Sequence, residues 1–191
     1  SRRHRATPLK GGSMMWWALG PSRSRTWRVI PALVAKLAEL GLLERPLHII
    51  SANLHSVVNL LYGYETFKGE VSKKDDHDIY KSVQRFMDRG AEVKKIAEKS
   101  GFQELQDESG SQINCQIINT AALDAVEIHP DVRISKEIMK VEKPILLVMD
   151  YAFGTQAFEA MDELLKPWKY EGSERKLNVQ SISIMGKAGT L

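Results

Sequence analysis

Two apolar segments of strand length, on either side of one amphipathic helix, are the feature of the sequence that most constrains its fold. KPILLVMD, residues 143–150, contains a continuous apolar run, which predicts a strand buried on both faces. One apolar helix face follows over residues 157–165, and NVQSISIM, residues 178–185, is typical of a second strand. A strand, a helix and a strand in this order predict parallel strands joined by a right-handed crossover. The expected class is therefore α/β.

The same two patterns recur upstream. Apolar residues at spacings of three and four predict a helix over residues 27–40, with Gly41 as its stop. LHIIS, residues 47–51, predicts a short buried strand, and the apolar residues of 52–64 predict the next helix. Residues 65–78 are charged and predict a surface loop.

The middle of the chain predicts one more helix and two more strands. Residues 79–101 have the helical pattern, with Gly90 inside the helix or dividing it and Gly101 as its stop. Residues 102–111 are polar and are compatible with an edge strand and a turn. INCQIINT, residues 113–120, alternates and then becomes apolar, as a strand does.

Two connecting segments complete the prediction. Residues 128–141 fit either a pair of strands or a short helix, and residues 166–176 fit a solvated connection. The whole pattern predicts a three-layer α/β sandwich with a mostly parallel sheet. The chain ends on a glycine turn after an apolar strand, whose face a following helix would normally cover. We therefore expect a sheet that is incomplete at the C-terminus, in a fragment of a larger domain.

The charge is distributed unevenly along the chain. The first 28 residues carry seven basic side chains and no acidic one, so the net charge of +3 leaves about −4 for residues 29–191. We expect residues 1–25 to be a disordered basic leader and residues 26–191 to form the α/β domain. A transit peptide or an RNA-contacting tail is the alternative for the leader. A mildly acidic domain gives no support for nucleic-acid binding.

Composition argues against several classes of site. The longest uncharged apolar run, residues 144–149, is far shorter than the roughly 18 to 20 residues of a membrane span, so no membrane partner is expected. Cys115 is the only cysteine, which excludes an intramolecular disulfide framework and indicates a reducing, cytoplasmic location. We expect this thiol to be inert packing. The five histidines lack the spacing of metal ligands, so neither a metal nor a cofactor is expected.

Three segments follow predicted strands at their carboxyl ends, where loops and helix N-termini present free backbone N–H groups. These segments are residues 51–55, 151–156 and 186–190. Ser51, Asn53 and His55 are candidate substrate contacts, and His55 is also a candidate for proton transfer. A purely structural role is the alternative for all three. Asp150 is expected to cap the turn that follows it, with acid or base catalysis as the alternative.

The last of these segments, GKAGTL, has the chemistry of an anion site. Gly186 and Gly189 allow backbone turns that expose N–H donors. Lys187 adds a positive charge, and Thr190 adds a hydroxyl group. Together these groups suit a phosphate or a phosphorylated sugar. The segment matches neither the P-loop pattern nor GxGxxG, and an ordinary tight turn is the alternative.

Glycine turns at the ends of the two C-terminal strands carry a resemblance to a known family. The sequence ILLVMDYAFGTQAFEAMDELL is followed, after a connection, by VQSISIMGKAGTL. This arrangement resembles the central strand–helix–strand unit of the nucleoside phosphorylase and nucleosidase superfamily. Gly154 matches the first glycine turn of that unit, and the second turn is matched by Gly186, Ala188, Gly189 and Leu191.

The resemblance implies a site and a reaction. In that superfamily the second turn lies against the phosphate or the catalytic water and the ribose. The implied reaction of the intact protein is cleavage of the N-glycosidic bond of a nucleoside or nucleotide, with inorganic phosphate as a co-substrate or with water. The implied phosphate- or substrate-binding residues are Gly154, Thr155, Gly186, Lys187, Ala188, Gly189 and Thr190; no catalytic residue is assigned.

A binding module without catalysis is the alternative function. Such a module would keep the α/β scaffold and use the same turns to hold a nucleotide or a phosphosugar. In both cases the expected partner is a small-molecule nucleoside or nucleotide, and a homo-oligomer is compatible with either.

Overall fold

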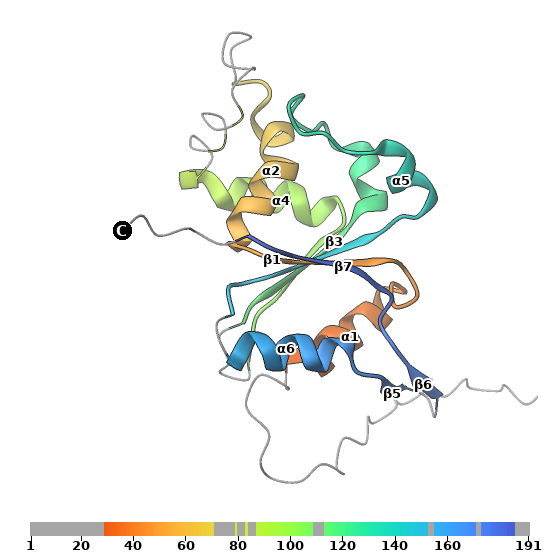
Figure 1. Ribbon diagram of the computed structural model, residues 1–191. Coiled ribbons are helices and arrows are strands. Elements are labelled where there is room, and N and C mark those ends of the chain that lie inside the picture. Colours follow the sequence, from red (N-terminus) through yellow and green to blue (C-terminus); the bar gives the residue numbers. More distant parts are fainter. Residues whose placement is uncertain are drawn as a thin grey trace, which may run out of the picture.

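A mixed five-stranded β-sheet with helices on both faces forms the centre of the protein, as a computed structural model shows (Figure 1). The structure describes residues 29–70, 79, 83, 87–108, 113–152, 155–170 and 173–185. The strands of this sheet are β1 (Leu47–Ser51), β2 (Phe102–Leu105), β3 (Cys115–Asn119), β4 (Ile145–Met149) and β7 (Val179–Ile184). The α-helices in the described ranges are α1 (Val29–Glu39), α2 (Leu54–Phe67), α4 (Gly90–Lys99), α5 (Lys136–Val141) and α6 (Thr155–Leu165).

The order of the strands across the sheet is β2-β3-β4-β1-β7. Strand β1 is parallel to both of its neighbours, β4 and β7, whereas β3 is antiparallel to both β2 and β4. The α/β class is therefore confirmed, but the prediction of a mostly parallel sheet is wrong. Only a short connection separates β2 from β3, and such a connection joins antiparallel neighbours, because parallel neighbours need a crossover of a dozen or more residues.

Helices α1 and α6 cover one face of the sheet, which we call the α1/α6 face (Figure 1). Helix α1 buries Leu33, Val34 and Leu37, which share one side of a helix of 3.6 residues per turn. They pack on every second residue of the strands, since side chains alternate between the faces of a sheet. The buried strand residues on this face are Leu47, Ile49, Cys115, Ile117, Ile145, Leu147 and Met149.

Helices α2 and α4 cover the other face, which we call the α2/α4 face (Figure 1). Helix α2 buries Val57, Val58, Leu61 and Tyr62 there. The strands contribute the alternate residues, among them Ile118. The 3-10 helix η3 (Thr120–Ala125) and α5 continue this layer between β3 and β4. Because both faces of the sheet are covered, the three-layer arrangement predicted from the sequence is present.

Two local predictions differ from the structure, and one alternative that the sequence left open is decided. Helix α2 continues to Phe67, which is buried, so the predicted loop over residues 65–78 begins too early. The charged segment 166–176, predicted to be a solvated connection, contains a hairpin of β5 (Trp168–Tyr170) and β6 (Ser173–Arg175). Residues 128–141 resolve into one short helix, α5, whose start is capped by Ser135.

Both predicted glycine stops are confirmed. Gly41 follows α1 with a φ of 67°, and Gly101 follows α4 with a φ of 85°. This left-handed conformation is common just after a helix and favours glycine because it has no Cβ. Gly101 has a second constraint, since a Cβ at this position would lie 2.6 Å from the Cβ of Ala122.

Candidate functional site

Three parallel strands end side by side at one edge of the sheet, which we call the carboxyl edge. Ser51, the last residue of β1, pairs with Met149 of β4 and with Ile184 of β7. The backbone N–H of Ala52 donates to the Met149 carbonyl at 3.0 Å, and that of Met185 donates to the Ser51 carbonyl at 2.8 Å. These bonds continue the alignment one residue beyond the strands, so the segments that follow start from neighbouring points.

The chain leaves β1 and β4 toward opposite faces of the sheet. After β1 it enters α2 on the α2/α4 face, and after β4 it enters α6 on the α1/α6 face (Figure 1). Neighbouring strands whose connections diverge in this way form a topological switch point. Ligands of open α/β sheets bind in the crevice outside such a point. The geometry therefore selects the carboxyl edge between β1 and β4 as the candidate site.

The structure brings three of the predicted site residues together at this edge. Ser51 is buried at the end of β1, and Asn53 caps α2 by accepting the His55 backbone N–H through Oδ1 at 2.9 Å. This cap satisfies one of the free N–H groups at a helix start. Thr155 is the first residue of α6, on the opposite face. The predicted residues Gly154, Gly186, Lys187, Ala188, Gly189 and Thr190 lie outside the described ranges.

A cavity of about 370 Å³ lies beside the carboxyl edge on the α2/α4 face. Its volume is within the range of small-molecule sites, about 300 to 1,000 Å³. It lies between the first two turns of α2 and of α4, Val83 and the strands β2 and β3, and it is partly open to solvent. The residues that line it are Asn53, His55, Ser56, Val58, Asn59, Val83, Gly90, Ala91, Lys94, Phe102, Glu104 and Gln116.

Two buried amides give this cavity its chemistry. Gln116 is 4% exposed, and the alternation of β3 places it on the same face as Ile118, toward the cavity. Its Oε1 atom is buried and has no hydrogen-bond partner. Asn59 of α2 is 5% exposed and lines the same cavity. An unsatisfied buried acceptor costs about 1 to 3 kcal/mol, and a ligand that donates a hydrogen bond to Gln116 would remove this cost.

The charged residues of the cavity wall neutralise one another. Lys94 of α4 donates a hydrogen bond to the Glu104 carboxylate of β2. Phe102 is buried and supplies an apolar wall. The described lining therefore combines an aromatic surface, the amides of Asn53, Asn59 and Gln116, and a neutralised ion pair. Such a lining suits an uncharged ligand rich in hydrogen-bonding groups better than a polyanion.

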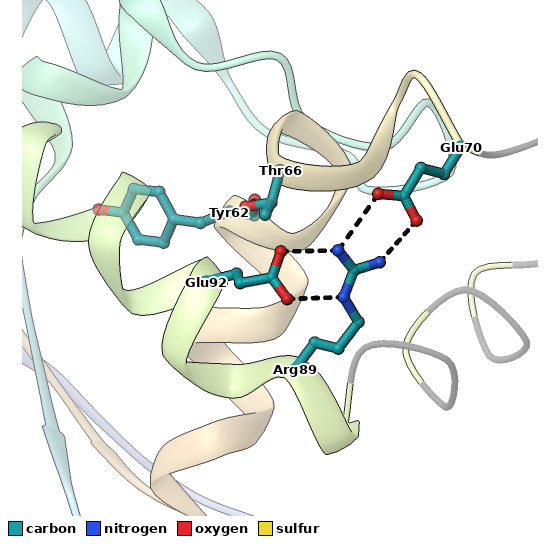
Figure 2. Close-up of polar contacts among 5 residues, drawn as sticks. All are labelled: Tyr62, Thr66, Glu70, Arg89 and Glu92. Carbon is teal, nitrogen blue, oxygen red and sulfur yellow. Dashed lines mark hydrogen bonds and ion pairs between the residues drawn. The ribbon is translucent and has the colours of Figure 1, made fainter.

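Arg89 holds the start of α4 against the end of α2 and so fixes one wall of the cavity. Its guanidinium group donates to both carboxylate oxygens of Glu70, at 2.6 and 3.2 Å, and of Glu92, at 2.7 and 2.6 Å (Figure 2). It also lies 4.2 Å from the centroid of the Phe67 ring. Hydrogen bonds to Glu92 and Glu70 raise the pKa of Arg89. These groups are at the surface, where ion pairs contribute little to the unfolding free energy. The main effect of the network is therefore to orient α4.

Tyr62 fixes the other end of α4. It lies on α2 (Figure 2), is fully buried, and donates a hydrogen bond from its hydroxyl to the Ser100 carbonyl at 3.2 Å. Its ring meets Phe102 edge to face, with 6.5 Å between centroids. Burial raises the pKa of Tyr62, so the phenol stays a neutral donor. Helix α4, which contributes Gly90, Ala91 and Lys94 to the lining, is therefore tied to the α2 segment at both of its ends.

The other candidates from the sequence have structural roles. Burial, followed by the charges of Asp107 and Asp150, raises the pKa of Cys115 to about 12, which agrees with inert packing. The Asp150 carboxylate accepts the Tyr151 backbone N–H at 2.8 Å, which is the capping role expected of it. In the described ranges no three histidine, cysteine or acidic side chains form a metal-sized group. No helix in that part of the chain is long and apolar enough to span a membrane.

Sequence reasoning found the edge but missed most of the cavity. Asn59, Lys94, Glu104 and Gln116 were not predicted as site residues, because α4 and β2 reach this place only through tertiary packing. The one available signal was Gln116, a polar residue in the middle of the otherwise apolar strand INCQIINT.

The fold and the cavity define an α/β domain with a small-molecule cavity beside a topological switch point. The family described as "Family of unknown function (DUF6909)" matches residues 66–191. The chain therefore belongs to this family. No curated protein and no solved structure shows a significant match to it.

Proposed function

We propose that this protein binds a nucleoside or nucleotide in the cavity at the carboxyl edge. The observation that carries the proposal is the Gln116 Oε1 atom, which is buried without a partner in a cavity lined by a second buried amide, Asn59. Pairs of amides suit the edge of a nucleobase, because each amide offers both donors and an acceptor. The Phe102 side chain adds an apolar wall for such a ring.

The neutralised ion pair favours a nucleoside part over a phosphate part in this cavity. Lys94 is engaged by Glu104, so among the described lining residues no lysine or arginine is left for a phosphate. Any phosphate of a bound nucleotide would extend toward the switch point. The candidate partner of that phosphate is the segment 186–190, on the basis of its sequence alone.

Cleavage of the N-glycosidic bond is the second candidate function. The resemblance of residues 145–165 and 179–191 to the nucleoside phosphorylase and nucleosidase superfamily favours it. Strands β4 and β7, which carry the two matching turns, both run parallel to β1 and end at the same edge. Lys187 would then contact the phosphate or the sugar.

Isothermal titration of the full chain with adenosine, inosine, uridine and their monophosphates tests the binding proposal. At least one nucleoside should bind, and Gln116→Leu should weaken it about tenfold or more, since a hydrogen bond is lost in a buried site. Gln103→Leu, the same change on neighbouring β2, should leave binding unchanged. The unfolding free energy of Gln116→Leu should not fall, because the change removes an unsatisfied acceptor.

Two results would count against the proposal: the absence of nucleoside binding, or equal weakening by the Gln116 and Gln103 changes. Release of free base, with phosphate or water as the acceptor, separates the enzyme from the binding module. If release occurs, Lys187→Ala should slow it about tenfold or more. Binding without release leaves the binding module as the function.

A further inference from the structure

A second cavity, of about 400 Å³, lies on the α2/α4 face at the opposite edge of the sheet. It is formed by the segment from η3 to α5, which leaves the sheet after β3 and returns to it at β4 (Figure 1). Asn119 at the end of β3 pairs with Ile145 at the start of β4, so this edge is the one opposite the carboxyl edge. The cavity shares no lining residue with the proposed nucleoside site.

His129 presents an unsatisfied donor in this cavity. The side chain is 3% exposed, and its ring packs edge to face on Tyr64 of α2, with 5.3 Å between centroids. The Nδ1 atom accepts the backbone N–H of Asp131 at 3.1 Å. The Asp131 carboxylate also lies near this nitrogen, with Oδ2 3.9 Å from Nδ1. An Nδ1 that accepts a hydrogen bond leaves Nε2 as the donor of the ring. This Nε2 atom is buried and has no hydrogen-bond partner, so the site lacks an acceptor.

The charges around the cavity indicate what that acceptor is. Arg133 and Lys136 line the cavity, and neither forms an ion pair with any residue that the structure describes. The two acidic residues of the lining have partners outside the cavity. Asp124 lies 3.5 Å from Lys140, and Glu127 lies 3.0 Å from Lys68, which it shares with Glu65. The lining therefore offers two cationic side chains without ion pairs among the described residues, Arg133 and Lys136, on the same cavity as His129.

We propose that this cavity is a second binding site, which takes a small oxyanion, a carboxylate or phosphate group, on His129, Arg133 and Lys136. An oxyanion supplies the acceptor that Nε2–H lacks. Charge-assisted hydrogen bonds to arginine and lysine are about twice as strong as neutral ones. Because α2 runs from Asn53 at the first cavity to Tyr64 at the second, the two sites share one helix while using different residues.

Titration of the full chain with inorganic phosphate and, separately, with succinate tests this proposal. We expect at least one of the two to bind with a Kd below about 10 mM. The double variant Arg133→Ala/Lys136→Ala should raise that Kd about tenfold or more. Both side chains are exposed, so the variant should remain folded. Lys95→Ala/Lys99→Ala removes the same charge from outside the cavity and should leave the Kd within about twofold.

A third variant separates this site from a general charge effect and from the nucleoside cavity. His129→Phe keeps an aromatic ring against Tyr64 but removes the Nε2–H donor, and should weaken binding, whereas Gln116→Leu should not. Binding of phosphate alone identifies a phosphate site, and binding of succinate alone identifies a carboxylate site. The proposal is overturned if neither anion binds, or if the two double variants weaken binding equally.

Discussion

The two faces of the sheet differ in how completely they are filled. On the α1/α6 face, α1 and α6 pack on a continuous set of apolar strand residues. On the α2/α4 face the core is also apolar, but three buried polar side chains, Asn59, Gln116 and His129, line two cavities at its ends. The same strands supply both faces. The difference therefore lies in the helices and connections that cover them.

Both faces stabilise the fold, because each buries a large apolar cluster, and a fully buried aliphatic side chain contributes about 1.5 to 3 kcal/mol. Buried polar groups without partners lower stability. Gln116 and His129 each contain one such atom, and each lines a cavity of the α2/α4 layer. This pairing of a cavity with an unsatisfied polar atom is the reason for placing both proposed ligand sites there.

Adjacent isoleucines of β3 allow the largest test of this comparison. Ile117 points to the α1/α6 face and Ile118 to the α2/α4 face, and both are fully buried. Each change to alanine should lower the unfolding free energy by about 2 to 5 kcal/mol. The Ile117→Ala change should lower the unfolding free energy more than Ile118→Ala. The continuous apolar packing of the α1/α6 face lets neighbouring side chains move less into the space that the lost side chain leaves.

Urea unfolding followed by circular dichroism measures both values. The matched pair has the same residue type, strand and burial, so helix or strand propensity cannot explain a difference. Equal costs, or a larger cost at Ile118, would show that the two faces are packed equally well and would break the comparison.

The stability of the protein at high pH tests the packing of the α1/α6 face through a smaller expected effect. Cys115 has a pKa of about 12 in the folded protein against 9.0 when exposed. Above pH 9 the unfolded chain therefore loses a proton that the folded chain keeps. The unfolding free energy should fall with rising pH up to about pH 12, by at most about 1.4 kcal/mol per pH unit. Cys115→Ala should remove this contribution when unfolding is measured from pH 8 to 11.

Alkylation of native protein at pH 8 gives an independent readout of the same burial. The thiol should react with iodoacetamide only after urea is added, since the reactive thiolate does not form in the buried site. Rapid labelling of the native chain would mean that solvent enters the α1/α6 face.

The glycines that end α1 and α4 give the smallest of the three effects. Gly41→Ala should cost about 1 kcal/mol, because its φ is positive but no atom lies within 4 Å of the added Cβ. Gly101→Ala should cost more, about 1 to 3 kcal/mol, because the added Cβ meets Ala122 as well. Thermal unfolding of the two variants checks this order. Equal costs would show that η3 moves away from the added Cβ at Ala122, and so is packed more loosely than the structure indicates.

Much of the fold was predictable from local pattern, and the errors have physical causes. The strands at residues 47–51 and 145–149 were predicted because a short apolar run between turn signals is typical of a buried strand. The orientation of β3 was not predictable, because an alternating strand has the same sequence pattern in either direction. The hairpin of β5 and β6 was missed because all three residues of β6 are exposed, so this strand lacks the alternation of a half-buried strand.

The candidate site was predictable only in part. The strand-end rule located Ser51, Asn53 and His55 at one edge. It could not find Lys94 or Gln116, whose neighbours in the cavity are far away in the sequence.

The sequence by itself determined the α/β class, the positions of the central strands and the edge at which parallel strands end. These properties follow from the periodicity of apolar residues and from glycine and proline, which act over a few residues. Only the tertiary structure decided the mixed sheet, the unequal filling of its two faces and the two cavities with buried polar atoms. Each of these depends on which distant segments pack together, and so on the shapes and hydrogen bonds of side chains that meet only after folding.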